Sequence, residues 1–173
     1  MSDTTHTHSA SQWFVPVATA LGDGTGRPCV TGLHGSAAGL ATTLLHSQLG
    51  KLGHRSWLIV TGSDEAAERL FDDLHFFHDL TGIPTTSLAL FPRWETLPYE
   101  GSAPHVSLIA RRMNALHHIR STPHTCLVTS IAALMQRLLP VTTFISTTLQ
   151  FKLNGTIERE VLTGGLLRLG YRK

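Results

Sequence analysis

Residues 56–71, SWLIVTGSDEAAERLF, join a short apolar run to a segment with a polar start. The run SWLIVTG, residues 56–62, is typical of a buried strand because nearly all of its side chains are apolar. Ser63 is suited to cap a helix, and Asp64 and Glu65 then stand in the first turn, where the helix dipole favours acidic side chains. The apolar residues that follow recur at helical spacing: Ala67, Leu70, Phe71, Leu74 and Phe77. This stretch therefore predicts a strand followed directly by an amphipathic helix.

The same alternation of strand and helix patterns continues along the chain. Three further apolar runs predict strands, at 28–33, 85–92 and 124–130. Apolar residues at helical spacing follow the run at 28–33 and predict a helix there. The same spacing recurs after the Pro- and Gly-rich loop that ends near Pro104, and predicts another helix. A short helix is expected from Ile131 to Leu139, before Pro140. Apolar strands that alternate with helices predict an α/β fold, a parallel sheet with helices on both faces.

Length and composition allow one domain with a proper core, and the start of another. The chain has 173 residues, of which 42% are hydrophobic and 15% are charged, and its formal net charge is +2. This charge is too small to indicate nucleic-acid binding by itself. The N-terminus lacks the pattern of a signal peptide, no apolar run reaches the about 18 residues of a membrane span, and Cys29 and Cys126 lie in predicted buried strands. These features predict a reduced, cytoplasmic protein without membrane partners.

Changes of composition divide the chain into three parts. Residues 1–11 are polar and predict a flexible tail, in which His6 and His8 lack a third metal ligand nearby. Residues 12–140 carry the α/β pattern. After Pro140 the chain is rich in Thr and β-branched residues, and a helix-like stretch runs from Glu158 to Leu169. We expect residues 141–173 to begin a second domain that is cut short.

The stretch GLHGSAAG, residues 32–39, lies between a predicted strand and a predicted helix and fits the frame of a phosphate-binding P-loop, G-x-x-x-x-G-K-[ST]. A working loop needs a final Gly, a Lys for the phosphates and a Ser or Thr for Mg²⁺, and these positions hold Ala37, Ala38 and Gly39. Gly32, Gly35 and Ser36 remain, and a helix N-terminus attracts anions only weakly without the lysine. The strand ending in Thr129 and Ser130 also lacks the Asp that would complete a Mg²⁺ site. The residues predict a P-loop-shaped turn that binds no nucleotide cofactor.

The stretch FPRWETLPYEGSAPHVSLIARRMNAL, residues 91–116, resembles the N-terminal region of bacterial transcription-repair coupling factors. Three more stretches resemble that family in the expected order: residues 60–77, residues 130–140 and the tail TLQFKLNGTIEREVLTGGLLRLGYRK. Together the resemblance covers about residues 13–173. Its signature loop contains Trp94, Glu95, Leu97, Pro98, Tyr99, Pro104 and His105.

The resemblance implies a specific fold and role. The family's N-terminal module is similar to the UvrB protein of excinuclease ABC, a P-loop, helicase-like (RecA-like) ATPase, but has a degenerate nucleotide loop and continues into a second, α+β domain. The span from Trp94 to His105 is too short for the DNA-binding hairpin of those relatives. Full-length family members recruit the UvrA protein of excinuclease ABC through the second domain, by a basic turn expected just beyond Lys173, so the resemblance implies impaired UvrA binding by this chain. They contact RNA polymerase, and move on DNA with ATP, through later domains that are absent here. The resemblance thus implies a non-catalytic scaffold in transcription-coupled nucleotide excision repair.

Several polar groups invite other interpretations. Glu95 and His105 share a loop with Trp94 and Tyr99, but no nucleophile or metal stands with them, so we expect no catalytic residue. Trp94 and Tyr99 are expected to hold the loop on the edge of the sheet, and Glu95 and His105 to bond to the backbone. His75 and His78, near Asp72 and Asp79, are expected to be solvated rather than to form a metal site. The adjacent His117 and His118 point about 100° apart on a helix and cannot easily share an ion.

Two alternative functions stay open at this point. Arg111 and Arg112, with Arg120, Lys51 and Arg55, could face phosphates and make the chain a stand-alone DNA-binding domain, although a scattered solvated face is at least as consistent with their spacing. An active NTPase would need Lys51 or Arg55 to replace the missing lysine.

Overall fold

The computed structural model describes residues 14–24, 26–51, 56–96, 99, 101, 103–149, 151, 153–169 and 171. The chain forms two compact units, Met1–Gln136 and Arg137–Lys173. Each unit is described by itself below. The expected tail, residues 1–11, lies outside the described residues, as do His6 and His8.

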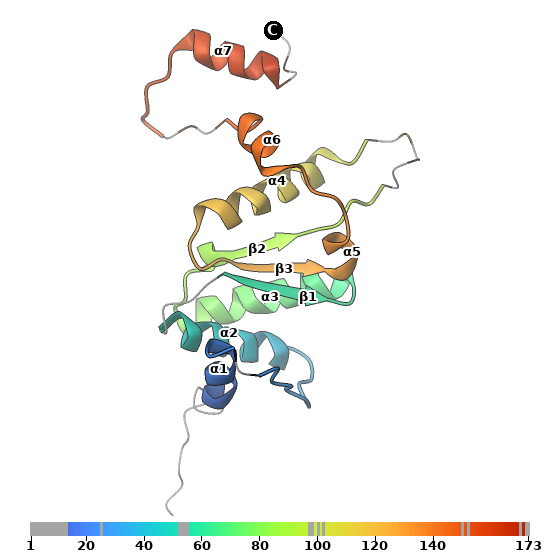
Figure 1. Ribbon diagram of the computed structural model, residues 1–173, viewed down its shortest axis with the longest axis vertical. Helices are drawn as coiled ribbons and strands as arrows, with labels where there is room; N and C mark the ends of the chain where they lie inside the picture. The colour runs from blue at the N-terminus through green and yellow to red at the C-terminus, as the bar shows by residue number, and fades with distance from the viewer. Residues whose placement is uncertain are drawn as a thin grey trace, which may run out of the picture. The chain divides into compact units, whose positions relative to one another are not determined.

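A three-stranded parallel sheet forms the centre of the first unit (Figure 1). Strand β3, Cys126–Ser130, lies in the middle and pairs with β1, Trp57–Thr61, and with β2, Leu88–Phe91. Helix α3, Asp64–Thr81, connects β1 to β2, and helix α4, Val106–Ser121, connects β2 to β3. The strands and helices of 56–130 therefore follow the predicted alternation, and the α/β class is confirmed.

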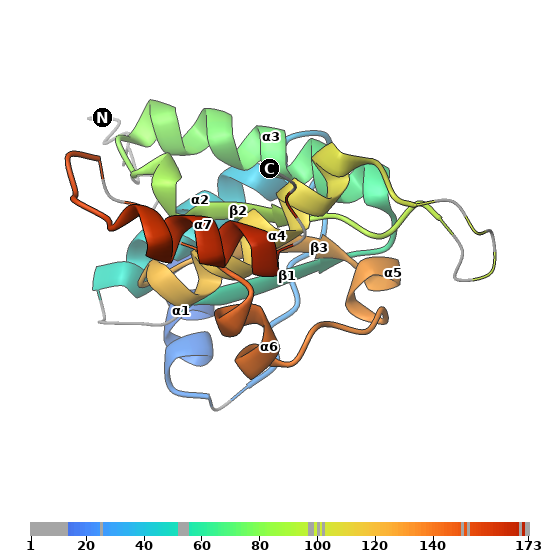
Figure 2. The same ribbon diagram turned by 90° about the horizontal axis from the view of Figure 1, so that it is seen from above.

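Helices cover the two faces of this sheet (Figures 1 and 2). Helix α3 packs on one face, around Leu74, Cys126 and Val128, and α4 packs on the other, around Ala89 and Ala115. Helix α2, Ala37–Lys51, lies on the outer side of α3, and α1, Val15–Gly22, lies against α2. The first unit is thus layered, with α4, the sheet, α3 and α2 in succession.

Helix α3 begins as its sequence predicts. The Ser63 hydroxyl accepts a hydrogen bond from the Ala66 N–H at 3.1 Å, and so satisfies one of the free donors of the first turn. Gly82 follows the helix with φ of 70°, a left-handed conformation that glycine adopts without steric cost.

The expected strand at 28–33 is wrong. Residues 26–34 form neither helix nor strand, and Cys29, Val30 and Leu33 are exposed. A strand needs a neighbour for its backbone groups, and the three strands of the described sheet pair only with one another. The apolar pattern alone could not show that this neighbour is missing. Cys126, in contrast, is buried as predicted, and burial raises the pKa of its thiol to about 12.

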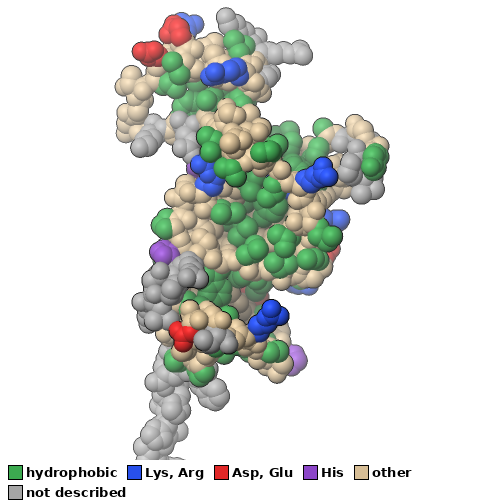
Figure 3. Space-filling model, in the orientation of Figure 1, with side chains coloured by type: hydrophobic (Ala, Val, Ile, Leu, Met, Phe, Trp, Pro, Cys, Tyr) green, Lys and Arg blue, Asp and Glu red, His purple; other side chains and the backbone are tan. Residues whose placement is uncertain are grey.

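Described residues leave the face of β1 opposite α3 largely uncovered. Trp57 and Ile59 pack toward α3, whereas Leu58 and Val60 point to the opposite face and are 55% and 43% exposed. The face drawn in Figure 3 accordingly carries many hydrophobic side chains over the sheet of the first unit.

The described part of the second unit is helical. It contains α6, Val141–Ser146, and α7, Arg159–Arg168, and no strand is assigned among its described residues. The Thr-rich stretch ends α6 rather than forming a strand, because Thr147 and Thr148 donate their hydroxyl hydrogens to the carbonyls of Thr143 and Phe144. Helix α7 matches the predicted stretch, and Gly165 lets it approach Leu149. The assignment of residues 141–173 to a second, α+β domain stays a prediction.

Helix α5, Ile131–Leu134, ends five residues earlier than predicted. None of the helices in the described parts of the chain is long and apolar enough to cross a membrane.

Candidate functional site

The glycine turn at 32–36 is exposed and leads directly into α2. Gly32 and Gly35 have φ of 80° and 55°, which explains why both positions are glycine. The Ala37 N–H donates to the His34 carbonyl at 3.1 Å and closes the turn. The turn therefore resembles a P-loop on its helix side only, because no strand precedes it in the described chain.

Gly39 occupies the position where a P-loop carries its Mg²⁺-binding hydroxyl, and it is buried against α3. A Cβ built on Gly39 would lie 2.6 Å from the Cβ of Asp73, closer than two such atoms can pack. A Ser or Thr at this position would push α2 away from α3. Helix packing thus uses the space that phosphate chemistry would need.

The contact between Gly39 and α3 lies away from the edge of the sheet where α/β proteins usually bind ligands. That edge is formed by the carboxyl ends of the strands, where Asp64 begins α3. Asp73, which contacts Gly39, lies nine residues further along α3, or about 13 Å at 1.5 Å per residue. Lys51 stands at the far end of α2, about 21 Å from Ala37 by the same measure, so it cannot replace the missing lysine. Arg55 lies outside the described residues.

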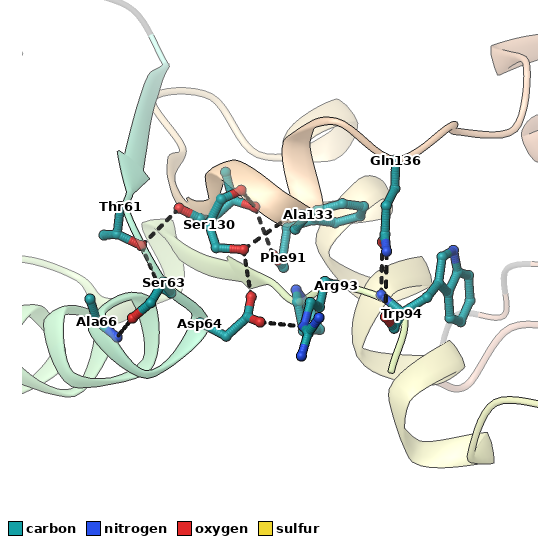
Figure 4. Close-up of polar contacts among 12 residues, drawn as sticks. Thr61, Ser63, Asp64, Ala66, Phe91, Arg93, Trp94, Ser130, Ala133 and Gln136 are labelled. Carbon is teal, nitrogen blue, oxygen red and sulfur yellow. Dashed lines mark hydrogen bonds and ion pairs between the residues drawn. The ribbon is translucent and has the colours of Figure 1, made fainter. Parts of the chain in front are cut away.

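The carboxyl ends of the three strands carry a network of polar contacts (Figure 4). Asp64, after β1, accepts a hydrogen bond from the Ser130 hydroxyl at the end of β3 and forms an ion pair with Arg93, which follows β2. Ser130 also caps α5, because its oxygen accepts a hydrogen bond from the Ala133 N–H at 3.1 Å. The network joins all three strand ends.

Sequence reasoning missed most of this network. The pattern around Asp64 predicts only a favourable place in the first turn of its helix, and it predicts no such contact for Arg93 or Ser130. The capping preference of a Ser between a strand and a helix could have identified Ser130. Nothing in the sequence signals that Arg93 meets Asp64, because the two residues belong to different strand ends.

Arg112 is buried at 1% exposure, between the rings of Phe91 and Trp94. Its guanidinium carbon lies 4.1 Å and 4.3 Å from the two ring centroids, within cation–π range. Nη1 donates to the Pro92 carbonyl at 2.6 Å and to the Gln136 Oε1 at 3.1 Å. Burial lowers the pKa of Arg112 to about 10, so its charge persists at neutral pH. The expectation that Arg112 faces phosphates is therefore wrong.

Gln136 connects this buried arginine to the signature loop. Its Oε1 accepts a hydrogen bond from the Trp94 N–H at 2.8 Å, and its Nε2 donates to the Trp94 carbonyl at 3.4 Å (Figure 4). Trp94 is thereby fixed at the base of the loop, which matches the expected structural role.

The rest of the signature loop is less tied to the domain. Tyr99 is 97% exposed, which contradicts the expectation that it holds the loop on the sheet. Glu95 is exposed, Pro104 is half-buried, and Leu97 and Pro98 lie outside the described residues. His105 caps α4, because its Nδ1 accepts a hydrogen bond from the Ser107 N–H. No reactive arrangement forms among these described residues.

Arg111, next to Arg112 on the same helix, points to solvent and pairs with Glu68 of α3 at 3.5 Å. Since Arg112 faces the core, the two arginines do not form one phosphate-facing surface.

The histidines of α3 differ from the solvated pair that the sequence predicts. His75 is exposed and pairs with Asp79 at 3.5 Å, but His78 is buried and stacks on His46 of α2, with ring centroids 5.4 Å apart. Burial lowers the pKa of both stacked rings. Within the described ranges, no group of three His, Cys, Asp or Glu side chains could hold a metal ion.

These features define a class: an α/β domain with a parallel sheet, in which Gly39 serves the packing of two helices and the polar groups at the strand ends contact one another. Comparisons with known proteins identify a narrower group of relatives. The chain is 32% identical over 100 residues to a transcription-repair-coupling factor of Haemophilus influenzae, and 31% identical over 144 residues to one of Myxococcus xanthus. The corresponding protein of Escherichia coli is 26% identical over 140 residues.

The three alignments cover 58%, 82% and 81% of this chain, but only 8%, 12% and 12% of those proteins. The chain is therefore related to the transcription-repair-coupling factors and spans a small part of their length. No protein-family model matches it, and no solved structure does.

Proposed function

We propose that this chain serves as a non-catalytic scaffold region of a transcription-repair-coupling factor and acts in transcription-coupled nucleotide excision DNA repair. Similarity to three proteins of that name supports the pathway. The contact between Gly39 and Asp73 supports the absence of catalysis, because it leaves no room for the hydroxyl that a nucleotide site requires. The domain is then a P-loop, RecA-like relative whose nucleotide site has become a helix-packing contact.

Calorimetric titration of the 173-residue chain with ATP and Mg²⁺ tests this proposal. We expect no binding, either for the chain itself or for its Ala38→Lys variant, which regains the lysine but not the hydroxyl. Micromolar binding that is lost in a Ser36→Ala variant would refute the proposal and support an active nucleotide site at the turn.

We further propose that the second unit contributes to recruitment of UvrA, the excinuclease ABC protein that the resemblance implies as a partner. ATP-driven movement on DNA and contact with RNA polymerase then belong to other parts of the longer proteins. Purified UvrA, immobilised for surface plasmon resonance, should capture the 173-residue chain weakly, and should not capture a chain that ends at Gln136. Equal capture of both would contradict a role for the second unit.

The two alternative functions gain no support. An NTPase that uses Lys51 conflicts with the position of that residue at the opposite end of α2. A DNA-binding face built from Arg111 and Arg112 conflicts with the burial of Arg112.

A further inference from the structure

Strand β2 is at the edge of the described sheet, where one of its sides has no partner strand among the described residues. The Thr129 hydroxyl of β3 donates to the Phe91 carbonyl at 2.8 Å, so this carbonyl faces β3. Successive residues of a strand direct their backbone groups to opposite edges, so Leu88 and Leu90 direct theirs away from β3. The Leu88 N–H donates to the Thr85 carbonyl. The Leu88 carbonyl and both backbone groups of Leu90 have no strand partner among the described residues.

A cavity of about 340 Å³ lies along this edge, between α3 and α4. Leu88, Ala89 and Leu90 contribute to its lining from β2, together with Phe71 of α3 and Ala115 of α4. Natural edge strands are usually protected from pairing by being very short, by charged residues, by proline or by a bulge. Strand β2 is short, with four residues, but its sequence, LALF, carries neither a charge nor a proline.

The two walls of the cavity differ in charge. Helix α3 contributes Glu68 and Asp72, whereas α4 contributes Arg111, Asn114 and His118. Arg111 and Glu68 reach each other across the mouth at 3.5 Å, with side chains 49% and 57% exposed. Exposed ion pairs of this kind contribute little to stability, so incoming charged side chains can replace this one.

We propose that the outer edge of β2 binds an extended segment of a partner protein, which adds to the sheet as a fourth strand. Side chains of such a segment point alternately to the two faces of the sheet, and thus to α3 and to α4. The acidic wall favours basic side chains toward α3, and Arg111 favours acidic side chains toward α4. The preferred partner therefore has an extended segment in which basic and acidic residues alternate around an apolar centre.

Two capped peptides of equal composition test this proposal against the full chain. One has the sequence Lys-Glu-Val-Glu-Lys, which gives each face of the added strand charges of one sign, and the other Lys-Lys-Val-Glu-Glu, which gives each face charges of both signs. We expect the first to bind at least tenfold more tightly, and to slow hydrogen exchange of the Leu90 amide. Loss of discrimination, or binding that leaves that amide unprotected, would overturn the proposal.

A charge-swapped variant, Glu68→Arg with Arg111→Glu, provides the matched control. Both side chains are half-exposed and their ion pair is kept, so folding should be unaffected. Because Asp72 stays on α3, that wall carries both signs of charge in this variant, so the preference for the first peptide should be lost. An unchanged preference would refute the assigned walls. Sedimentation of the chain alone gives one further outcome: dimers that protect the Leu90 amide would overturn the assignment to a partner protein and identify a second copy as the occupant. The peptide result does not depend on the proposed role in repair.

Discussion

Gly39 illustrates how a single residue can carry two explanations. Its position in the P-loop frame predicts a lost hydroxyl, whereas its contact with Asp73 shows what it does in this fold. Glycine lets α2 and α3 approach closely because it has no side chain. The residue is therefore required for packing, whatever its origin.

Substitution Gly39→Ala should destabilise the chain by about 1–3 kcal/mol, because the added methyl group overpacks the contact between the two helices. Gly50→Ala is the matched control, since Gly50 lies in the same helix and a Cβ there meets no atom within 4 Å. This control should be stabilising by about 0.5–1 kcal/mol, through the higher helix propensity of alanine. Urea unfolding measures both changes. Equal effects would show that the close contact is not formed.

At the scale of the element, Arg112 joins α4 to the end of β2 and to the base of the signature loop. Its two ring contacts and two hydrogen bonds involve residues from 91 to 94 and Gln136. The network of Asp64, Arg93 and Ser130 similarly joins the ends of the three strands. Polar groups at this edge thus act as structural connections between elements.

Arg112→Met should lower the free energy of unfolding by about 2–4 kcal/mol, since it leaves the Pro92 carbonyl without a donor and removes both cation–π contacts. Arg112→Lys keeps the charge but not the planar group, and should also be destabilising. Arg111→Met, one residue earlier and exposed, should change stability by about 0.5 kcal/mol or less. Chemical denaturation of the three variants decides the matter. If Arg111→Met lowered the free energy of unfolding as much as Arg112→Met, the burial of Arg112 between the two aromatic rings would be wrong.

At the scale of the whole molecule, stability depends on contacts between layers that lie far apart in sequence. The stacked His46 and His78 stand between α2 and α3, with Trp57 of β1 at the edge of the His46 ring. Burial keeps both imidazoles neutral and lowers their pKa in the folded chain. The neighbouring Pro84 carbonyl and Asp79 oppose this effect at His78 without reversing it.

The lowered pKa values predict that acid destabilises the fold. The unfolded chain binds protons at these histidines near its ordinary pKa of about 6.5, whereas the folded chain resists protonation. The free energy of unfolding should therefore be constant above about pH 7 and fall as pH decreases below about 6.5. His78→Phe should weaken this dependence, and His75→Phe, at an exposed position, should not. Urea midpoints between about pH 8 and 5.5 provide the measurement, and a wild-type midpoint that rises with acid would contradict it.

Local pattern predicted the strands of the sheet and the helices between them, because backbone periodicity depends on neighbouring residues. The capping of α3 by Ser63 and the loss of the P-loop side chains were also readable from the sequence. The sequence pattern gave wrong predictions where the structure depends on contacts between distant segments. Residues 28–33 have the composition of a strand but do not pair with the described sheet. Arg112 has the spacing of a surface cation but is buried.

The sequence alone therefore determined the α/β alternation, the burial of Cys126 and the resemblance to the transcription-repair-coupling factors. Only the tertiary structure decided that β3 lies between β1 and β2, that Gly39 meets Asp73, and that Arg112 is enclosed by Phe91 and Trp94. The physical reason is the difference in range between the two kinds of interaction. Helix and strand preferences act between residues a few positions apart, whereas strand order, charge burial and helix contacts arise when distant segments exclude water together.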